Sequence, residues 1–293
     1  MKAMKKQRGY VLISGASILW GTMGILGKLA FEFGINPTTL IALRLLVSSL
    51  TISIPVALSR NLLKIQKKDL LPFLTLGVLA TAFQRLAYFY SIDLTTVTVA
   101  AILFYTYPIL VTIFSLIFFK EKISPLRIFS IVLAFLGVML VVRTYDITQL
   151  SSSLLGVIAG LLSSIFFVLF FFIIRRLRTS YSTWTLVFYG DGIGALALFP
   201  LTLISLSEIL NYPLQLWFLI LAIAWGPSLL AYLMYSHALK NVESAKGSTL
   251  GVLEPLSAAL FSLIILGEAF ELLQIAGIAL TLTGVALLFY SRT

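Results

Sequence analysis

Apolar residues in this chain gather in long runs that no charged residue interrupts, such as 9–27, 94–119 and 147–174. A transmembrane helix needs about 20 mostly apolar residues. Dividing the runs at their proline, glycine and polar breaks therefore predicts ten transmembrane helices. Their expected ranges are 10–31, 37–57, 70–90, 95–119, 125–142, 154–174, 184–205, 214–236, 247–266 and 272–290.

The pattern within the runs favours helices over strands. The runs are not built from alternating ten-residue segments, which are typical of a membrane β-barrel. A segment in lipid has to satisfy its own backbone hydrogen bonds, and a helix does so. The first run follows four basic residues, as a signal peptide does, but it is too long and has no clear A-x-A cleavage site. We therefore expect an all-α membrane protein whose first run is a helix.

Composition supports this fold class and excludes several others. Charged residues make up 11% of the chain and hydrophobic residues 60%, whereas a soluble domain has about 25% charged residues. The chain has no Cys and one His, which excludes thiolate zinc sites and iron–sulfur clusters. We expect no metal and no cofactor.

The basic residues are distributed unequally between the two sides of the membrane. Ten spans place both termini on one side, together with 17 of the 21 Lys and Arg residues. The other side has Lys28 and Arg143, and Arg44 and Arg85 lie within spans. This bias predicts cytoplasmic termini in a multi-pass protein of the cell membrane. It also assigns the net charge of +10 to contacts with anionic lipid rather than with nucleic acid.

The two halves of the chain resemble each other at an offset of 147 residues. Residues 100–140 align with 247–287 without gaps, and the alignment pairs Pro108 with Pro255, Glu121 with Glu268 and Gly137 with Gly284. Five helices in each copy would make the second copy enter the membrane from the opposite side, as in the inverted repeats of transporters. We expect one five-helix repeat over 1–147 and an inverted one over 148–293, with the junction near Ser151–Ser153.

These motifs resemble those of a known family. A proline, a glutamate and a glycine recur in that order, as Pro108…Glu121…Gly137 and as Glu254-Pro255…Leu266-Gly267-Glu268…Gly284; Trp20-Gly21, Arg44 and Ala231-Tyr232…Ser236-His237-Ala238-Leu239 add to the match. The chain is similar to the EamA-type group of the drug/metabolite transporter superfamily. The resemblance implies a ten-helix exporter of amino acids, related metabolites or toxic organic compounds. It also implies a central cavity between helices 1, 3, 4, 6, 8 and 9, with helices 5 and 10 at the periphery. The first copy departs from the pattern at Phe119-Lys120-Glu121.

Ionisable side chains within a bilayer are costly and are therefore candidates for function. Glu254 is the candidate for proton coupling, because a carboxyl group there can exchange a proton or bind the ammonium group of a substrate. The structural alternative is a protonated Glu254 that fastens its helix to a neighbour. Prolines inside helices interrupt the hydrogen-bond ladder, and Pro108, Pro227 and Pro255 are the candidate hinges.

Polar and aromatic residues of the expected cavity helices are candidate substrate contacts. Gln84 and Arg85 lie near the outer end of the third span, where Arg85 would either anchor a carboxylate or phosphate or extend to the membrane surface. Trp20, Tyr105, Tyr107 and Tyr232 would suit aromatic solutes and organic cations, with simple packing as the alternative.

Two further charged residues within spans favour structural roles. Arg44 is expected to have a structural partner. Asp191, which is flanked by glycines, is expected to mark closely packed or flexible backbone.

Several functions compete for this architecture. The chain has no G-x-x-x-x-G-K-[ST] motif, so we expect a secondary transporter working by alternating access rather than an ATPase or another enzyme. The alternatives are a transporter of phosphorylated metabolites or nucleotide sugars, an intramembrane enzyme, and a channel. The expected partners are a small-molecule substrate, the lipid bilayer and, for a coupled transporter, protons. Monomer and homodimer both remain open.

Overall fold

The computed structural model describes residues 2–107, 109–111, 113–114, 124–141, 145, 147–238 and 253–290, and its regular elements are helices. The longer ones are α1 (Lys2–Phe31), α2 (Pro37–Leu58), α3 (Leu70–Gly77), α4 (Gln84–Leu94), α5 (Val97–Phe104), α7 (Pro125–Val141), α8 (Ile147–Leu177), α9 (Thr183–Thr202), α11 (Leu214–Ile223), α12 (Ala231–Ala238), α14 (Leu253–Ile265) and α15 (Leu272–Tyr290). Short helical turns at Arg60–Leu63, Lys67–Asp69, Leu203–Ser205 and Leu206–Leu210 (α10) connect some of them.

The all-helical membrane fold expected from the sequence is confirmed. Within the described residues, six helical stretches are long and apolar enough to cross a bilayer, and four shorter apolar helices accompany them. These ten stretches fall on the ten expected ranges, but the count of ten crossings stays a prediction. The expected junction at Ser151–Ser153 lies inside α8, which begins at Ile147.

Local sequence signals explain where several helices begin. Asn36 caps α2, because its side-chain oxygen accepts a hydrogen bond from the backbone N–H of Thr39 at 2.9 Å, and Pro37 occupies the first helical turn. Thr96 caps α5 and Ser182 caps α9 in the same way. The breaks before these three helices are thus true helix starts.

Two transmembrane stretches contain π-helical segments. Val78–Phe83 joins α3 to α4, and Ala224–Leu230 joins α11 to α12. Pro227 lies in the second segment, where its missing N–H interrupts the α-helical ladder and the Ser228 hydroxyl donates to the Ile223 carbonyl at 2.7 Å. Such segments are frequent at functional sites. Each of the two ends two residues before a candidate contact, Arg85 in α4 and Tyr232 in α12.

The other two candidate hinges are placed differently. Pro255 is the third described residue of α14, and the residues directly before Leu253 lie outside the described part of the chain, so its role as a hinge stays a prediction. Pro108 lies outside the described residues.

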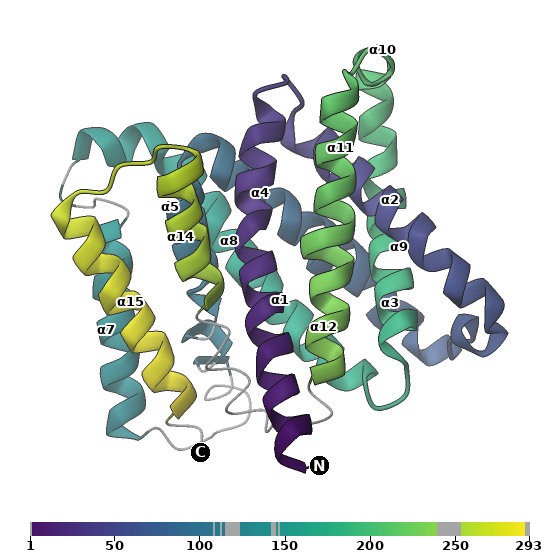
Figure 1. The fold of residues 1–293 in the computed structure, drawn as a ribbon, viewed down its shortest axis with the longest axis horizontal. Coiled ribbons are helices and arrows are strands. Elements are labelled where there is room, and N and C mark those ends of the chain that lie inside the picture. The colour runs from purple at the N-terminus through teal and green to yellow at the C-terminus, as the bar shows by residue number, and fades with distance from the viewer. Residues whose placement is uncertain are drawn as a thin grey trace.

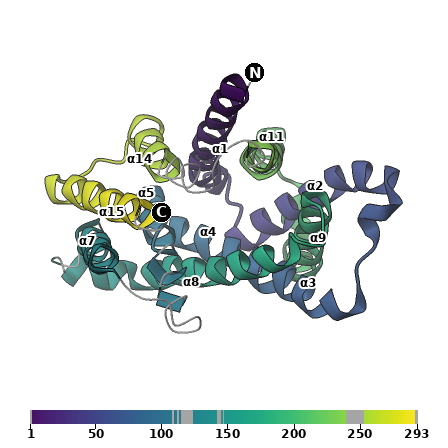
Figure 2. The same ribbon diagram turned by 90° about the horizontal axis from the view of Figure 1, so that it is seen from below.

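The helices form a bundle with a distinct pair at each end (Figures 1 and 2). α7 and α15 lie side by side at one end, and α2 and α9 lie at the other. Helices α1, α4, α5, α8, α11, α12 and α14 occupy the space between these pairs. The arrangement agrees with the expected peripheral position of the fifth and tenth spans.

Glycines bring α7 and α15 into backbone contact. A Cβ atom on Gly137 would lie 2.4 Å from Thr281 Oγ1 and 2.6 Å from the carbonyl oxygen of Gly277. A Cβ atom on Gly284 would lie 2.7 Å from the carbonyl oxygen of Ser130. The two helices therefore run antiparallel and approach as closely as small residues allow in a membrane bundle.

We predict that Gly137→Ala lowers the apparent melting temperature of the purified protein. The added methyl group would overlap the α15 backbone, which cannot rotate away as a side chain can, and overpacking of this kind costs about 1–3 kcal/mol. Gly192→Ala is the matched control, because its Cβ atom would meet its nearest neighbour, Ser49 Cβ, at 3.9 Å. Equal melting temperatures for the two variants would contradict the prediction.

Candidate substrate site between the helices

Glu254 lies where three helices meet. Its Oε2 atom accepts a hydrogen bond from the Tyr105 hydroxyl at 2.8 Å, which joins the start of α14 to the end of α5. α14 also packs tightly on α1, since a Cβ atom on Gly21 would lie 2.6 Å from Ser257 Cβ and 2.8 Å from the Glu254 carbonyl oxygen. The carboxyl group thus has a protein partner, as the structural alternative required, and it stays a candidate for coupling.

A group of aromatic rings in mutual contact extends from Tyr105, the partner of this carboxyl group. Tyr105 and Tyr107 lie 5.6 Å apart between ring centroids, and Tyr107 packs on Phe167 of α8 at 4.6 Å. Phe104 contacts all three rings. On the α1 side, the Trp20 ring lies 5.2 Å from that of Tyr235.

The structure adds ring residues that the sequence did not single out. Phe104, Phe167 and Tyr235 stood in strongly apolar or interfacial stretches, where packing against lipid was the simpler interpretation. Phe104 and Tyr235 each lie three residues from a candidate, Tyr107 and Tyr232, and this spacing was the available signal. Phe167 lies on another helix, α8, and had no such signal.

A charged cluster joins α2, α4 and α9. Arg85 Nη1 donates to Asp191 Oδ1 at 2.8 Å, and the Ser48 hydroxyl donates to Asp191 Oδ2. The Arg85 side chain is 23% exposed and that of Asp191 is 5% exposed. Because α4 continues to Leu94, Arg85 lies about 14 Å from the end of its helix. Arg85 therefore forms an ion pair inside the bundle. It does not extend to the membrane surface, which was one of the two expectations for this residue.

Arg44 belongs to the same cluster. Its side chain is fully buried, and its Nη1 atom donates to the Met23 sulfur at 3.2 Å. Arg85 and Asp191 lie close enough to Arg44 for their charges to act on it. Gln84, next to Arg85, is buried as well.

Asp191 is the residue of this cluster whose role the sequence left unrecognised. Its glycine neighbours favoured an interpretation as packed backbone, and part of that is confirmed, because a Cβ atom on Gly194 would lie 3.0 Å from the Gly77 carbonyl oxygen. An unpaired carboxylate at membrane depth is costly, and this cost was the available signal that Asp191 has a charged partner.

One helix face connects the two groups of residues. Tyr232 and Tyr235 are three residues apart on α12 and so project from the same side. Tyr232 lies within the electrostatic range of Arg85 and Asp191, and Tyr235 lies within that of Glu254. Both groups of residues therefore act electrostatically on this face of α12.

Polar contacts at the helix ends hold loops against the bundle. Glu268 accepts hydrogen bonds from the Val97 backbone N–H at 3.0 Å and from the Thr98 hydroxyl at 3.1 Å, so it caps the start of α5. Asp69 accepts from the Tyr181 hydroxyl at 2.8 Å and pairs with Arg176 at 3.4 Å. Glu121, the sequence counterpart of Glu268, lies outside the described residues.

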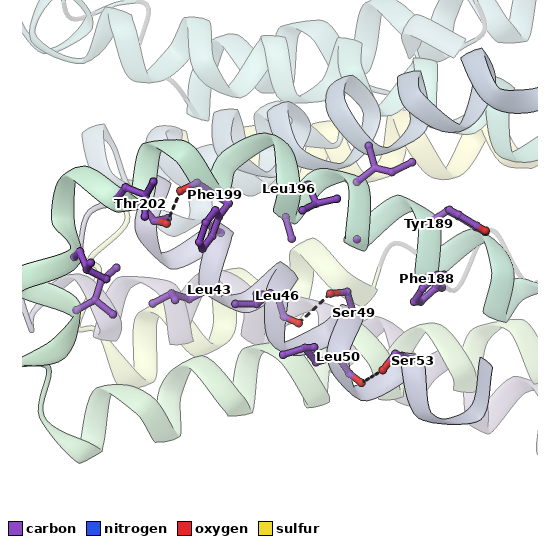
Figure 3. A pocket seen from close by; sticks show the side chains of 17 residues that line it. Leu43, Leu46, Ser49, Leu50, Ser53, Phe188, Tyr189, Leu196, Phe199 and Thr202 are labelled. Atoms are coloured by element: carbon purple, nitrogen blue, oxygen red, sulfur yellow. Dashed lines mark hydrogen bonds between the residues drawn. The ribbon is translucent and has the colours of Figure 1, made fainter. Parts of the chain in front are cut away.

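A pocket of about 440 Å³ lies between α2 and α9, on the outer side of the bundle (Figure 3). Its walls are almost entirely apolar, and Leu50 and Leu196 are 60% and 73% exposed. The hydroxyl groups of Ser49, Ser53 and Thr202 donate to carbonyl groups of their own helices. The pocket is typical of a surface covered by lipid chains and contains none of the candidate site residues.

The comparisons with known proteins agree with this architecture. The model of the EamA-like transporter family matches the chain twice, over residues 7–143 and 154–290. An uncharacterized transporter of Archaeoglobus fulgidus is 28% identical over 72% of this chain and 74% of its own length. The uncharacterized inner membrane transporter YicL of Salmonella typhimurium is 25% identical over 96% and 95%.

A solved crystal structure shares the fold. It has a TM-score of 0.62 at 18% identity and covers 98% of this chain and 97% of its own. Together with the two family-model matches, which span nearly the whole sequence, these findings show that the chain is a multi-pass membrane transporter and belongs to the EamA-like transporter family.

Proposed function

We propose that this protein is a secondary transporter that exports amino acids or related small metabolites and drugs from the cytoplasm by alternating access. The observation that carries the proposal is that two groups of opposite charge act on one α12 face, Glu254 on Tyr235 and Arg85 on Tyr232. An ammonium group would bind beside Glu254 and a carboxylate beside Arg85. Aromatic rings between them, including Trp20, would contact an apolar side chain.

Alternating access requires two halves that can exchange roles around one site. We propose that residues 1–147 and 148–293 form inverted repeats with both termini in the cytoplasm. The α7–α15 contact supports this. The counterparts of Gly137 and Gly277, 147 positions away in the other half, are Gly284 and Ser130, and these two residues also lie in close contact. The two π-helical segments are also related by nearly this offset.

A transporter of phosphorylated metabolites or nucleotide sugars is the second candidate. The presence of two guanidinium groups, from Arg44 and Arg85, in one cluster favours an anionic substrate of some kind. A phosphate dianion would, however, approach the Asp191 carboxylate as well. A monoanionic carboxylate is repelled less, and we therefore favour amino acids.

The test is uptake of labelled solutes into proteoliposomes with and without a proton gradient. The panel contains aromatic and small polar amino acids, an organic cation and a sugar phosphate. Gradient-driven accumulation of amino acids would support the leading proposal, and exchange without gradient dependence would indicate a facilitative transporter. Flux of the sugar phosphate alone would favour the second candidate, and no flux of any solute would contradict both.

We predict that Trp20→Ala and Tyr232→Ala raise the KM for aromatic substrates several-fold, with little change in expression. Each substitution removes a ring that faces the proposed site, and a ring contact contributes about 0.5–1.5 kcal/mol beyond the area that it buries. Phe199→Ala is the control, since Phe199 lines the lipid-facing pocket. Unchanged KM values in both variants would exclude these residues from the substrate site.

A further inference from the structure

Arg44 has unused hydrogen-bonding capacity in a fully buried position. Its Nε and Nη2 atoms are buried and have no hydrogen-bond partner among the residues that the structure describes. These two nitrogens form one edge of the guanidinium group, the edge that binds both oxygens of a carboxylate side by side. A buried charge normally has a partner because desolvation without one is costly. The empty edge therefore needs an explanation.

Asp191 is the carboxylate whose charge acts on Arg44. Ser48, which already donates to Asp191 Oδ2, lies four residues after Arg44 on α2. Residues four apart lie on the same helix face, so Arg44 and Ser48 both face α9. Asp191 nevertheless pairs with Arg85, through one oxygen and one nitrogen.

Among the residues that the structure describes, the cluster contains one carboxylate for two guanidinium groups. Arg44 and Arg85 each carry a positive charge, and Asp191 is their shared counter-ion. An anion entering the bundle would balance the remaining charge. It would meet Arg85 first, because Arg85 is partly exposed and Arg44 is not.

We propose that Arg85 binds the carboxylate group of the substrate and that Asp191 passes from Arg85 to the empty edge of Arg44 when it does. Arg44 is then a positioning residue, which acts on the substrate through Asp191. With substrate bound, this exchange leaves every charged group of the cluster with a partner. Without substrate, Asp191 neutralises Arg85. This proposal rests on the proposed function, because it specifies the substrate as a carboxylate.

The experiment measures ligand binding by detergent-purified protein, so that it does not depend on transport. The probes are phenylalanine and serine, each compared with its amide, which keeps the ammonium group and lacks the carboxylate. The readouts are the apparent dissociation constant and the ligand-induced rise in melting temperature. The variants are Arg85→Gln, Arg44→Gln and the double variant Arg44→Gln/Asp191→Asn.

The expected results differ for each variant. Arg85→Gln removes the preference for the acid over the amide. Arg44→Gln raises the dissociation constant of the acids by about tenfold or more, because release of Asp191 would leave its carboxylate unpaired, and it leaves amide binding unchanged. The double variant regains binding of the acids to within about threefold of the wild type, since Arg85 then has no competing counter-ion.

Three outcomes would overturn the proposal. Equal effects of Arg44→Gln on acid and amide binding would mean that Arg44 has only a structural role. Failure of the double variant to regain binding would mean that Arg44 itself contacts the substrate. No preference of the wild type for acids would exclude a carboxylate site. Failure of the proposed function is a separate result, in which acids bind but none crosses the proteoliposome membrane.

Discussion

Glu254→Gln is expected to abolish accumulation of substrate driven by a proton gradient while leaving exchange across the membrane intact. Glutamine keeps the size of the side chain, and its amide oxygen can still accept the hydrogen bond from Tyr105. It cannot release a proton. For one proton moved per solute, a gradient of one pH unit sustains about tenfold accumulation. The variant should therefore lower this ratio to about one in proteoliposomes that contain no substrate at the start, while labelled substrate still exchanges into vesicles loaded with cold substrate.

The controls separate coupling from a structural role of Glu254. Glu208→Gln makes the same change at an exposed site and should keep the wild-type accumulation ratio. Thermal unfolding and size-exclusion chromatography would show whether Glu254→Gln remains folded. A variant that unfolds would indicate that the carboxyl group fastens α14 to α5. A folded variant that still accumulates substrate would place the proton site elsewhere.

Much of the fold could be predicted from sequence because the bilayer restricts the solutions. Apolar runs gave the helices, and capping residues such as Asn36 and Ser182 stand at their observed starts. The positions of the π-helical segments were harder to foresee. Pro227 indicates one of them, but Val78–Phe83 contains no proline, and its register depends on packing against neighbouring helices.

The partners of the charged residues could not be predicted from helix periodicity. Periodicity indicates the face on which a residue lies, but Arg85 and Asp191 are 106 positions apart in sequence. They meet because α3 and the Val78–Phe83 segment, which lead into α4, pack on α9. The internal repeat contained an unused signal. Arg44 and Asp191 are 147 positions apart, the offset of the repeat, so a two-fold relation would place them on facing sides of the α2–α9 contact.

Asp191→Asn is expected to cause the largest loss of stability of any single substitution in the charged cluster. It leaves two guanidinium groups, those of Arg44 and Arg85, without a counter-ion inside the bundle. Removing one partner of a buried ion pair costs about 3–5 kcal/mol. Because Arg85 is 23% exposed and retains some hydration, the lower end of this range applies.

A loss of about 3 kcal/mol corresponds to a fall of roughly 6–12 °C in the apparent melting temperature, at about 2–4 °C per kcal/mol for a chain of this size. Asp93→Asn is the matched control, since Asp93 is exposed at the end of α4. Adding Arg44→Gln to Asp191→Asn removes one of the two unpaired charges and should recover part of the loss. A counter-ion shared by two cations inside the bundle cannot be removed without cost. Equal melting temperatures for Asp191→Asn and Asp93→Asn would therefore mean that Asp191 stabilises neither arginine.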